Sequence, residues 1–160
     1  FEQSLGRKHF HVAAAMNGLG LMLASRHLNA EAKQAYVEAL DILVDAMGEG
    51  HAHTTNVLNN LGLVCTQLGE YSEAEAYSLR ALKNKRALHG EESVDVALSH
   101  DNLGDLYSRW QKWEQAQQEY RESIRILALN EDTKRYFAYP QGRLIAVLVE
   151  LGDLKAAAQA

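Results

Sequence analysis

Three stretches of the sequence decide the fold: MNGLG at residues 16–20, LNNLG at residues 58–62 and HDNLG at residues 100–104. They stand at a constant spacing of 42 residues. Columns in the same frame hold one residue three times: Leu19, Leu61 and Leu103; Ala32, Ala74 and Ala116; Gly6, Gly48 and Gly90. Chance would give about half of one such column in a chain of this composition, so the sequence is an internal repeat.

Each repeat contains two stretches in which apolar residues follow helical spacing. In the first stretch, the apolar positions are Val12, Met16, Leu19 and Leu23, then Leu58, Leu61, Cys65 and Leu68, then Val96, Leu103 and Tyr107. In the second stretch, small and large residues alternate at Ala32, Tyr36, Ala39, Leu40 and Leu43, then Ala74, Tyr77, Ala81 and Leu82, then Ala116, Tyr120, Ile124 and Leu127. Such stripes predict amphipathic helices, so each repeat is expected to be a helix pair.

Glycine stands inside each expected first helix, at Gly20, Gly62 and Gly104. A glycine there costs about 1 kcal/mol relative to alanine, which implies a packing reason. We expect the backbone of the paired helix to approach closely at these positions. Gly48 and Gly90 lie between repeats, where a glycine commonly ends a helix.

The repeat resembles the tetratricopeptide repeat, a helix-turn-helix unit with Leu-Gly in its first helix and alanine at fixed places in its second. Its length is similar to that of the long variety found in kinesin light chains, and the likeness is carried by residues 5–20, 48–62 and 68–82. The proline that this variety places ahead of each first helix is absent in all three repeats. The resemblance implies an all-α fold, a right-handed α-solenoid of stacked helix-turn-helix repeats.

We expect one array over residues 1–160. Its parts are the end of a preceding second helix at 1–5, repeats at 6–47, 48–89 and 90–131, and a partial fourth repeat at 132–160. Pro140 suits the first turn of the last expected helix, which starts at about Tyr139, because its missing N–H has no intrahelical partner there. The chain starts at Phe1 without a methionine, so we expect an interior segment of a longer array or an array closed by another element.

Composition excludes several function classes. The chain has 16 basic and 21 acidic residues and a net charge of -5, which argues against a nucleic-acid partner. The longest apolar run covers residues 144–149, far short of the roughly 20 residues that a membrane-spanning helix needs. The single cysteine, Cys65, allows no intrachain disulfide and fits an intracellular compartment, either the cytoplasm or an organelle interior.

Two histidines one residue apart, His51 and His53, recur one repeat earlier as His9 and His11. A metal site would need three or four ligands about 2.0–2.3 Å from one ion. Equivalent residues of stacked repeats stand about 10 Å apart, one helix diameter, and no nearby cysteine or acidic pair completes a set. We therefore interpret these histidines as part of the repeat and expect no metal site.

Catalysis has little support in the sequence. Cys65 lies on the apolar stripe of its helix, and we interpret it as a small buried hydrophobe rather than a nucleophile. His100 replaces an apolar residue of the same stripe and is expected to be a hydrogen-bonded core histidine. Because no serine-histidine-acid, phosphate-loop or dinucleotide motif is present, we expect no catalytic residue and no cofactor.

A line of residues lies about 100° round the first helices from the apolar stripe. Its members are Asn17, Leu21, Asn59, Leu63, Asp101 and Asp105, with Asn60 and Asn102 one step round and Arg109 near one end. In the family that the repeat resembles, first helices line a concave groove, and polar residues on this line hold an extended partner peptide. An asparagine amide donates and accepts at once, which suits pairing with a peptide backbone. The alternative is that these asparagines hydrogen-bond between neighbouring first helices.

The charge of this line limits the kind of partner. Arrays of this family that grip a terminal carboxylate use lysine and arginine in the groove, whereas Asp101 and Asp105 occupy the middle of this line. A carboxylate clamp is therefore disfavoured. A partner with basic or amide-rich character fits the third repeat better by charge complementarity.

The helix expected from Tyr139 contains six consecutive apolar residues, so it is apolar on every side, unlike a helix that lines an open groove. We expect it to pack under a further helix, repeat or capping segment. The alternative is a docking surface for another subunit. Its rim anchors would be Tyr136, Phe137 and Tyr139, beside Lys134 and Arg135.

These observations predict a non-catalytic scaffold or adaptor that binds a partner peptide or subunit through the concave face of the array. Two alternatives stay open. The chain is a structural subunit or assembly factor built into a large protein complex, or it is the ligand-sensing repeat segment of a signalling ATPase. A nucleotide-binding motif upstream of Phe1 would indicate the last of these.

Overall fold

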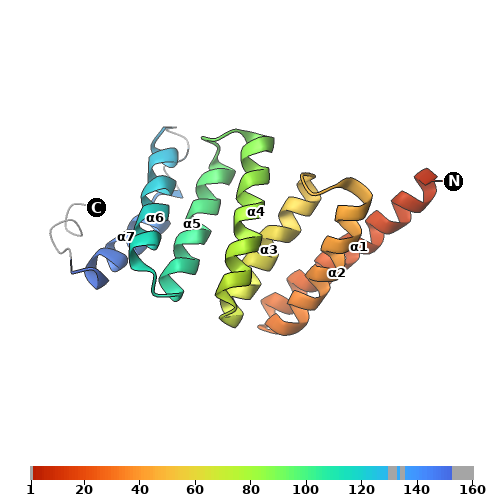
Figure 1. Cartoon of the computed structure of the whole chain (residues 1–160), viewed down its shortest axis with the longest axis horizontal. Helices are drawn as coiled ribbons and strands as arrows, with labels where there is room; N and C mark the ends of the chain where they lie inside the picture. Colours follow the sequence, from red (N-terminus) through yellow and green to blue (C-terminus); the bar gives the residue numbers. More distant parts are fainter. Residues whose placement is uncertain (1, 130–132, 134–135, 153–160) are drawn as a thin grey trace. The chain divides into compact units, whose positions relative to one another are not determined.

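In the computed structural model, residues 2–129, 133 and 136–152 are described, and within them the structure is helical with no strand. The helices are α1 (Glu2–Ser25), α2 (Asn29–Met47), α3 (Ala52–Leu68), α4 (Tyr71–His89), α5 (Val94–Arg109), α6 (Trp113–Ala128) and α7 (Ala138–Glu150) (Figure 1). Two helices fall in each 42-residue period, so the predicted all-α fold of helix-turn-helix repeats is confirmed.

The chain divides into two compact units, Phe1–Asn84 and Lys85–Ala160, and the division falls inside α4. Unit 1 contains α1, α2, α3 and most of α4, and unit 2 contains the end of α4 with α5, α6 and α7. Within unit 1, α2 packs against both α1 and α3, and within unit 2, α6 packs against both α5 and α7. The predicted repeat boundaries stay a prediction.

A left-handed residue follows the first helix of each full repeat. His27, Gly69 and Gln111 stand 42 residues apart and have φ angles of 61°, 78° and 59°. The left-handed conformation lets the next backbone N–H reach back to a carbonyl of the helix. These bonds join Leu28 to Leu23 at 3.0 Å, Glu70 to Cys65 at 2.9 Å and Lys112 to Tyr107 at 2.8 Å. The turn inside each helix pair is therefore the same in all three repeats, although only Gly69 is a glycine.

The predicted apolar stripe forms a core in α3 and α5 but is partly exposed in α1. Leu61 and Leu103 are 0% and 1% exposed, whereas the equivalent Leu19 is 40% exposed. Val12 is exposed as well, so the prediction that it joins the core is wrong. The physical reason is that α2 covers this side of α3, and no described helix covers the same side of α1.

The glycines inside the first helices make room for side chains of the second helices. A Cβ at Gly20 or Gly104 would overlap the ring of Tyr36 or Tyr120. We expected the backbone of the paired helix to approach closely, and at Gly20 and Gly104 this expectation is wrong, because an aromatic ring fills the space. At Gly62, a serine side chain of α4 lies closest, and α4 backbone atoms follow at 3.4 and 3.5 Å.

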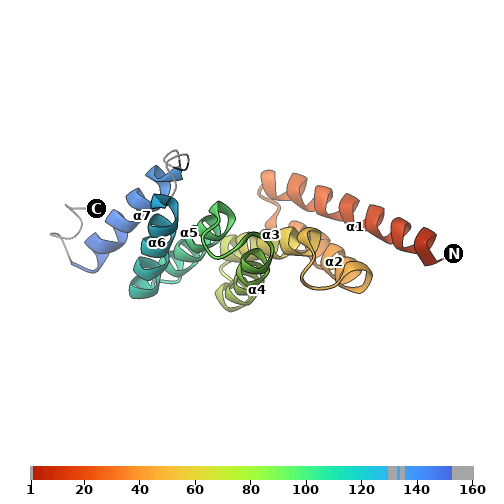
Figure 2. The same ribbon diagram turned by 90° about the horizontal axis from the view of Figure 1, so that it is seen from above.

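Helix α1 differs from the expectation at its start. Residues 1–5 were expected to end a preceding second helix, but α1 is unbroken from Glu2 to Ser25 (Figure 2). Gly6 therefore lies inside a helix, whereas Gly48 and Gly90 follow α2 and α4 with φ angles of 88° and 86°. The helical conformation satisfies the backbone groups of the stretch without a turn.

Helix α7 begins at Ala138 and contains Pro140 in its first turn, as predicted. One side of α7 is buried through Pro140, Leu144, Val147 and Leu148. Ile145 and Val149 on the other side are exposed. Lys134 and Arg135, the charged residues expected beside a docking surface, lie outside the described residues, as do residues 153–160.

Candidate functional site

A recess lies between the first helices of the first two repeats, α1 and α3, in unit 1. Its volume is about 240 Å³, and it is lined by Phe10, Ala13, Ala14 and Asn17 of α1, Leu43 of α2, and His53, Asn56 and Val57 of α3. Apolar side chains make most of this lining, and two amides and one imidazole supply its polar groups. No lining residue carries a fixed charge, so the recess suits a neutral, mainly apolar group.

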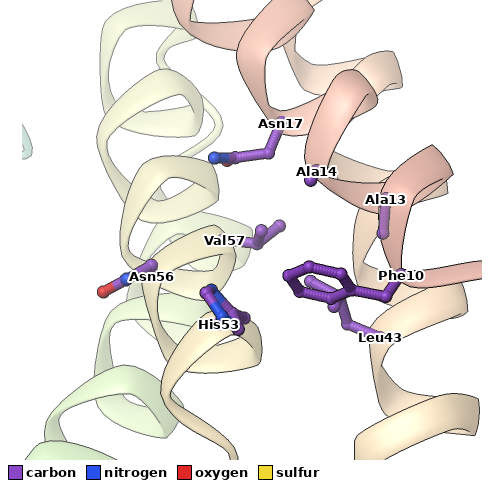
Figure 3. Close-up of a pocket in the computed structure, with 8 residues that line it drawn as sticks. All are labelled: Phe10, Ala13, Ala14, Asn17, Leu43, His53, Asn56 and Val57. Carbon is purple, nitrogen blue, oxygen red and sulfur yellow. The ribbon is translucent and has the colours of Figure 1, made fainter. Parts of the chain in front are cut away.

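Aromatic rings form one wall of this recess. The rings of Phe10 and His53 point toward each other from α1 and α3 (Figure 3), with centroids 5.0 Å apart. His11 lies beside Phe10 at 5.7 Å, and His51 stacks on His53 at 5.3 Å. The sequence interpretation treated His53 as part of the repeat and missed its place in the lining of a recess. The recurrence of His-x-His one repeat apart was the available signal.

His51 also begins α3. Its backbone is extended, with φ of -71° and ψ of 147°, and its Nδ1 accepts a hydrogen bond from the backbone N–H of His53 at 3.3 Å. This is the N-cap arrangement, in which a side-chain acceptor satisfies an N–H that has no partner inside the helix. One repeat later, Ser93 caps α5 in the same way through Val96.

Two residues of the predicted asparagine line contact each other between neighbouring helices. Asn60 donates from Nδ2 to Oδ1 of Asn17 over 3.1 Å, which joins α3 to α1 directly beside the recess. Both residues and Asn59 are half-buried. The bond supports the alternative that the asparagines brace neighbouring first helices. It uses one donor and one lone pair, out of the two donors and two lone pairs that each amide offers.

Two leucines of the same line face solvent. Leu21 of α1 is 51% exposed and Leu63 of α3 is 42% exposed. Exposed leucines beside an amide pair and an apolar recess form a mixed surface of the kind that interface cores use.

In unit 2 the same line is occupied by an internal ion pair. Arg143 of α7 donates from Nη1 to Asp101 at 2.6 Å, and its Nη2 lies 2.9 Å from Asp105. Asp105 also accepts from the Tyr120 hydroxyl at 2.7 Å. Burial raises the pKa of Asp101, although Arg143 opposes this shift. The expectation of a basic or amide-rich partner at the third repeat did not consider Arg143, which already pairs with both carboxylates.

The remaining candidates of unit 2 lie near this cluster on α5. Asn102 is half-buried and has an interaction partner, and Arg109 is exposed in the last turn of the helix. Asp101 itself is buried. The geometry therefore favours a bracing role for Asp101 and Asp105 and leaves Arg109 open to solvent.

His100 is a hydrogen-bonded core histidine, as the sequence predicted. It is buried in α5, and its Nδ1 lies 2.6 Å from a carboxylate oxygen of Glu119. Its Nε2 lies 3.3 Å from Nη2 of Arg86. Both ring nitrogens are therefore partnered, which explains how a polar ring replaces the apolar Met16 and Leu58 of the other repeats.

Among the described residues, one group of potential metal ligands lies close together, namely Cys65, Glu70 and Glu73, whose ligand atoms are within 4.8 Å of one another. Lys33 places its ammonium 2.7 and 2.8 Å from the two carboxylates. Burial raises the pKa of the Cys65 thiol to about 12, so the thiol stays protonated at neutral pH. We assign this group to an ion pair between α2 and α4 over a buried cysteine.

The structure is that of an all-helical repeat protein, and in unit 1 the neighbouring first helices line a recess. The sequence matches the model of the tetratricopeptide repeat over residues 11–87 and again over residues 53–128. The chain therefore belongs to the tetratricopeptide repeat family, which confirms the resemblance of its repeats. Within the described residues, no helix has the length and apolar character needed to cross a membrane.

Among solved structures, the crystal structure of BtubC (BKLC) from P. vanneervenii is similar to this chain. The two are 25% identical, the match covers 98% of this chain and 68% of that chain, and the TM-score is 0.86. The comparison with curated proteins found no match. Tetratricopeptide repeats generally mediate protein–protein interaction, and members of the family are typically scaffolds without catalysis.

Proposed function

We propose that the protein is a non-catalytic scaffold that binds an extended segment of a partner protein on the surface of α1 and α3. The recess between these helices carries the proposal, because it offers an apolar space beside amides on one continuous surface. A large apolar side chain of the partner enters the recess. The amides of Asn17 and Asn60 then pair with its backbone, and Leu21 and Leu63 cover it from the sides.

The size and chemistry of the recess support this assignment. A space of about 240 Å³ exceeds the volume of a single bound water many times and is large enough for one bulky side chain. Its uncharged lining predicts a neutral side chain, because a charged group would lose its hydration without gaining a partner. The net charge of -5 adds a weak preference for partners that are not strongly acidic.

The test fills the recess from an exposed position. Ala14 is exposed and lines the recess, and its neighbour Ala15 is exposed and does not line it. We expect Ala14→Trp to weaken binding of a peptide selected from a displayed library at least about tenfold, because one lost anchor costs more than about 1.4 kcal/mol. Titration calorimetry measures the affinity, and thermal melting checks that the variant is folded.

Ala15→Trp is the matched control and should bind as the unchanged chain does. If Ala14→Trp binds the selected peptides with unchanged affinity, the recess is not the binding site. The double variant Asn17→Ala, Asn60→Ala is a further check. If it lowers the melting temperature but leaves the affinity for the peptide unchanged, the two asparagines only brace the helices.

A second candidate function, a structural subunit of a larger complex, is favoured by α7. Its outer side exposes Tyr139 at 68% and Val149 at 50%, and exposed apolar side chains on one helix face commonly mark contacts with another protein. This candidate predicts concentration-dependent association of the isolated chain, which sedimentation velocity detects.

A further inference from the structure

The N-cap of α3 is a titratable residue, and the equivalent cap of α5 is not. His51 and Ser93 occupy the same position of successive repeats and accept from the backbone at the same distance of 3.3 Å. A serine hydroxyl keeps its acceptor at any ordinary pH. A protonated imidazole has no acceptor left.

The cap of α3 requires the neutral form of His51. Because Nδ1 accepts the N–H of His53, the ring proton must sit on Nε2. Protonation places a hydrogen on Nδ1 that faces the N–H of His53. It also places a positive charge at the helix N-terminus, where the macrodipole is already positive.

The groups around His51 also disfavour a positive charge at the N-terminus of α3. The ring of His53 stacks on it at an interplanar angle of 28°, so a second protonation there would place like charges 5.3 Å apart. On the α1 side, the recess presents Phe10, with His11 beside it.

An acidic residue two positions before His51 in the sequence is already paired. Glu49 accepts from Nε and Nη2 of Arg80 at 2.8 Å each, and this pairing lowers its pKa. Lys83, the other charged residue of α4 near Glu49, adds to the positive charge on this side. Glu49 is therefore already paired with Arg80 of α4 and would do little to stabilise a positive charge on His51.

We propose that His51 makes the wall of the recess sensitive to pH. Protonation of His51 releases the first turns of α3, which carry His53, Asn56 and Val57, and the recess loses that wall. A partner therefore binds more weakly at acidic than at neutral pH. The effect on binding rests on the proposed function, whereas the loosening of α3 does not depend on any partner.

The closing experiment measures amide hydrogen exchange of residues 54–58 in α3 at pH 5.5 and pH 7.5, corrected for intrinsic exchange. Residues 96–100 of α5, behind the Ser93 cap, are the internal control. We expect protection in α3 to fall about fivefold at pH 5.5, the effect of losing a typical cap, with no change in α5. His51→Ser should keep protection at both pH values, and His51→Ala should lose it at both.

Two further variants and a binding arm separate the outcomes. The His53→Gln variant should retain the pH dependence of hydrogen exchange in α3. If that pH dependence disappears in this variant, the titrating residue is His53 and not His51. Equal pH dependence in the unchanged chain and in His51→Ser overturns the proposal. If exchange behaves as expected and Ala14→Trp leaves peptide binding unchanged, the proposed function fails and the histidine cap stands. If the peptide binds equally at both pH values, the coupling of cap and recess is overturned.

Discussion

At the scale of single residues, the glycines of the first helices are matched to residues of the second helices. Tyr36 and Tyr120 are 1% exposed, and each fills the space over a glycine one helix away. Ser78 takes the same position in the second repeat. The glycine is the same in all three repeats while its partner differs in size, and in the first and third repeats interior packing leaves no room for both a methyl group and a ring.

Two glycines of α1 give opposite predictions for the same substitution. Gly20→Ala should lower the free energy of unfolding by about 1–3 kcal/mol, because the methyl group forces the Tyr36 ring to move. Gly18→Ala should raise it by about 0.5–1 kcal/mol, because Gly18 has no atom within 4 Å of an added Cβ and alanine favours the helix. Urea denaturation followed by circular dichroism measures both. Equal effects would contradict the packing explanation.

At the scale of elements, Arg143 ties α7 to α5. The guanidinium reaches two carboxylates one helical turn apart, and it stands 42 residues after Asp101. Asp101 is 7% exposed, so its carboxylate depends on Arg143 for compensation. The contact is therefore an inter-repeat brace that replaces the hydrogen bond between the side-chain amides of Asn60 and Asn17 in unit 1.

Removing Arg143 should destabilise unit 2 in a pH-dependent way. Arg143→Gln leaves Asp101 buried without a cation, and because the arginine is partly exposed and screened, we expect a loss of about 1–2 kcal/mol at pH 7. Burial raises the pKa of Asp101 in the folded state. The folded chain then takes up a proton more readily than the unfolded chain, so the loss should shrink as the pH falls through that pKa.

The pairing itself is checked by a double-mutant cycle measured by urea denaturation. Asp101→Asn with Arg143→Gln should recover most of the stability at pH 7, since a neutral amide is less costly to bury than an unpaired carboxylate. Additive losses in the double variant would show that the two side chains act independently.

At the scale of the whole molecule, the division into two compact units predicts separate responses to mutation. In repeat proteins, each helix pair contacts only its neighbours, so stability is close to a sum of local terms. Gly20 lies in unit 1 and Gly104 in unit 2, and each carries the same overlap with a tyrosine ring.

Hydrogen exchange should therefore locate the damage of each alanine variant. Gly20→Ala should reduce protection mainly in α2 and α3, and Gly104→Ala mainly in α5 and α6, by about five- to a hundredfold for a loss of 1–3 kcal/mol. Mass spectrometry of proteolytic fragments resolves these segments. A uniform loss of protection over all helices in either variant would show that the chain unfolds as one cooperative body.

Much of the fold could be predicted from the sequence, and less of the site. The helix pairs, buried Cys65 and partnered His100 follow from local spacing, and the structure confirms them. The exposure of Leu19 could not be predicted, because it depends on which helices flank α1. Arg143 was available in the sequence as the fourth member of the column that contains Asn17 and Asp101, but its pairing needed the packing of α7 on α5.

The sequence by itself determined the period and the two helices per repeat, because apolar spacing and glycine positions act over a few residues and recur three times. The family followed from the resemblance of these repeats to the tetratricopeptide repeat. Only the tertiary structure decided which contacts are made by the polar residues that lie on one line of the first helices. The contacts of His53 with Phe10 and of Asn60 with Asn17 each join residues 43 apart in the chain. Such contacts depend on how side chains of adjacent helices interlock, which no local pattern specifies.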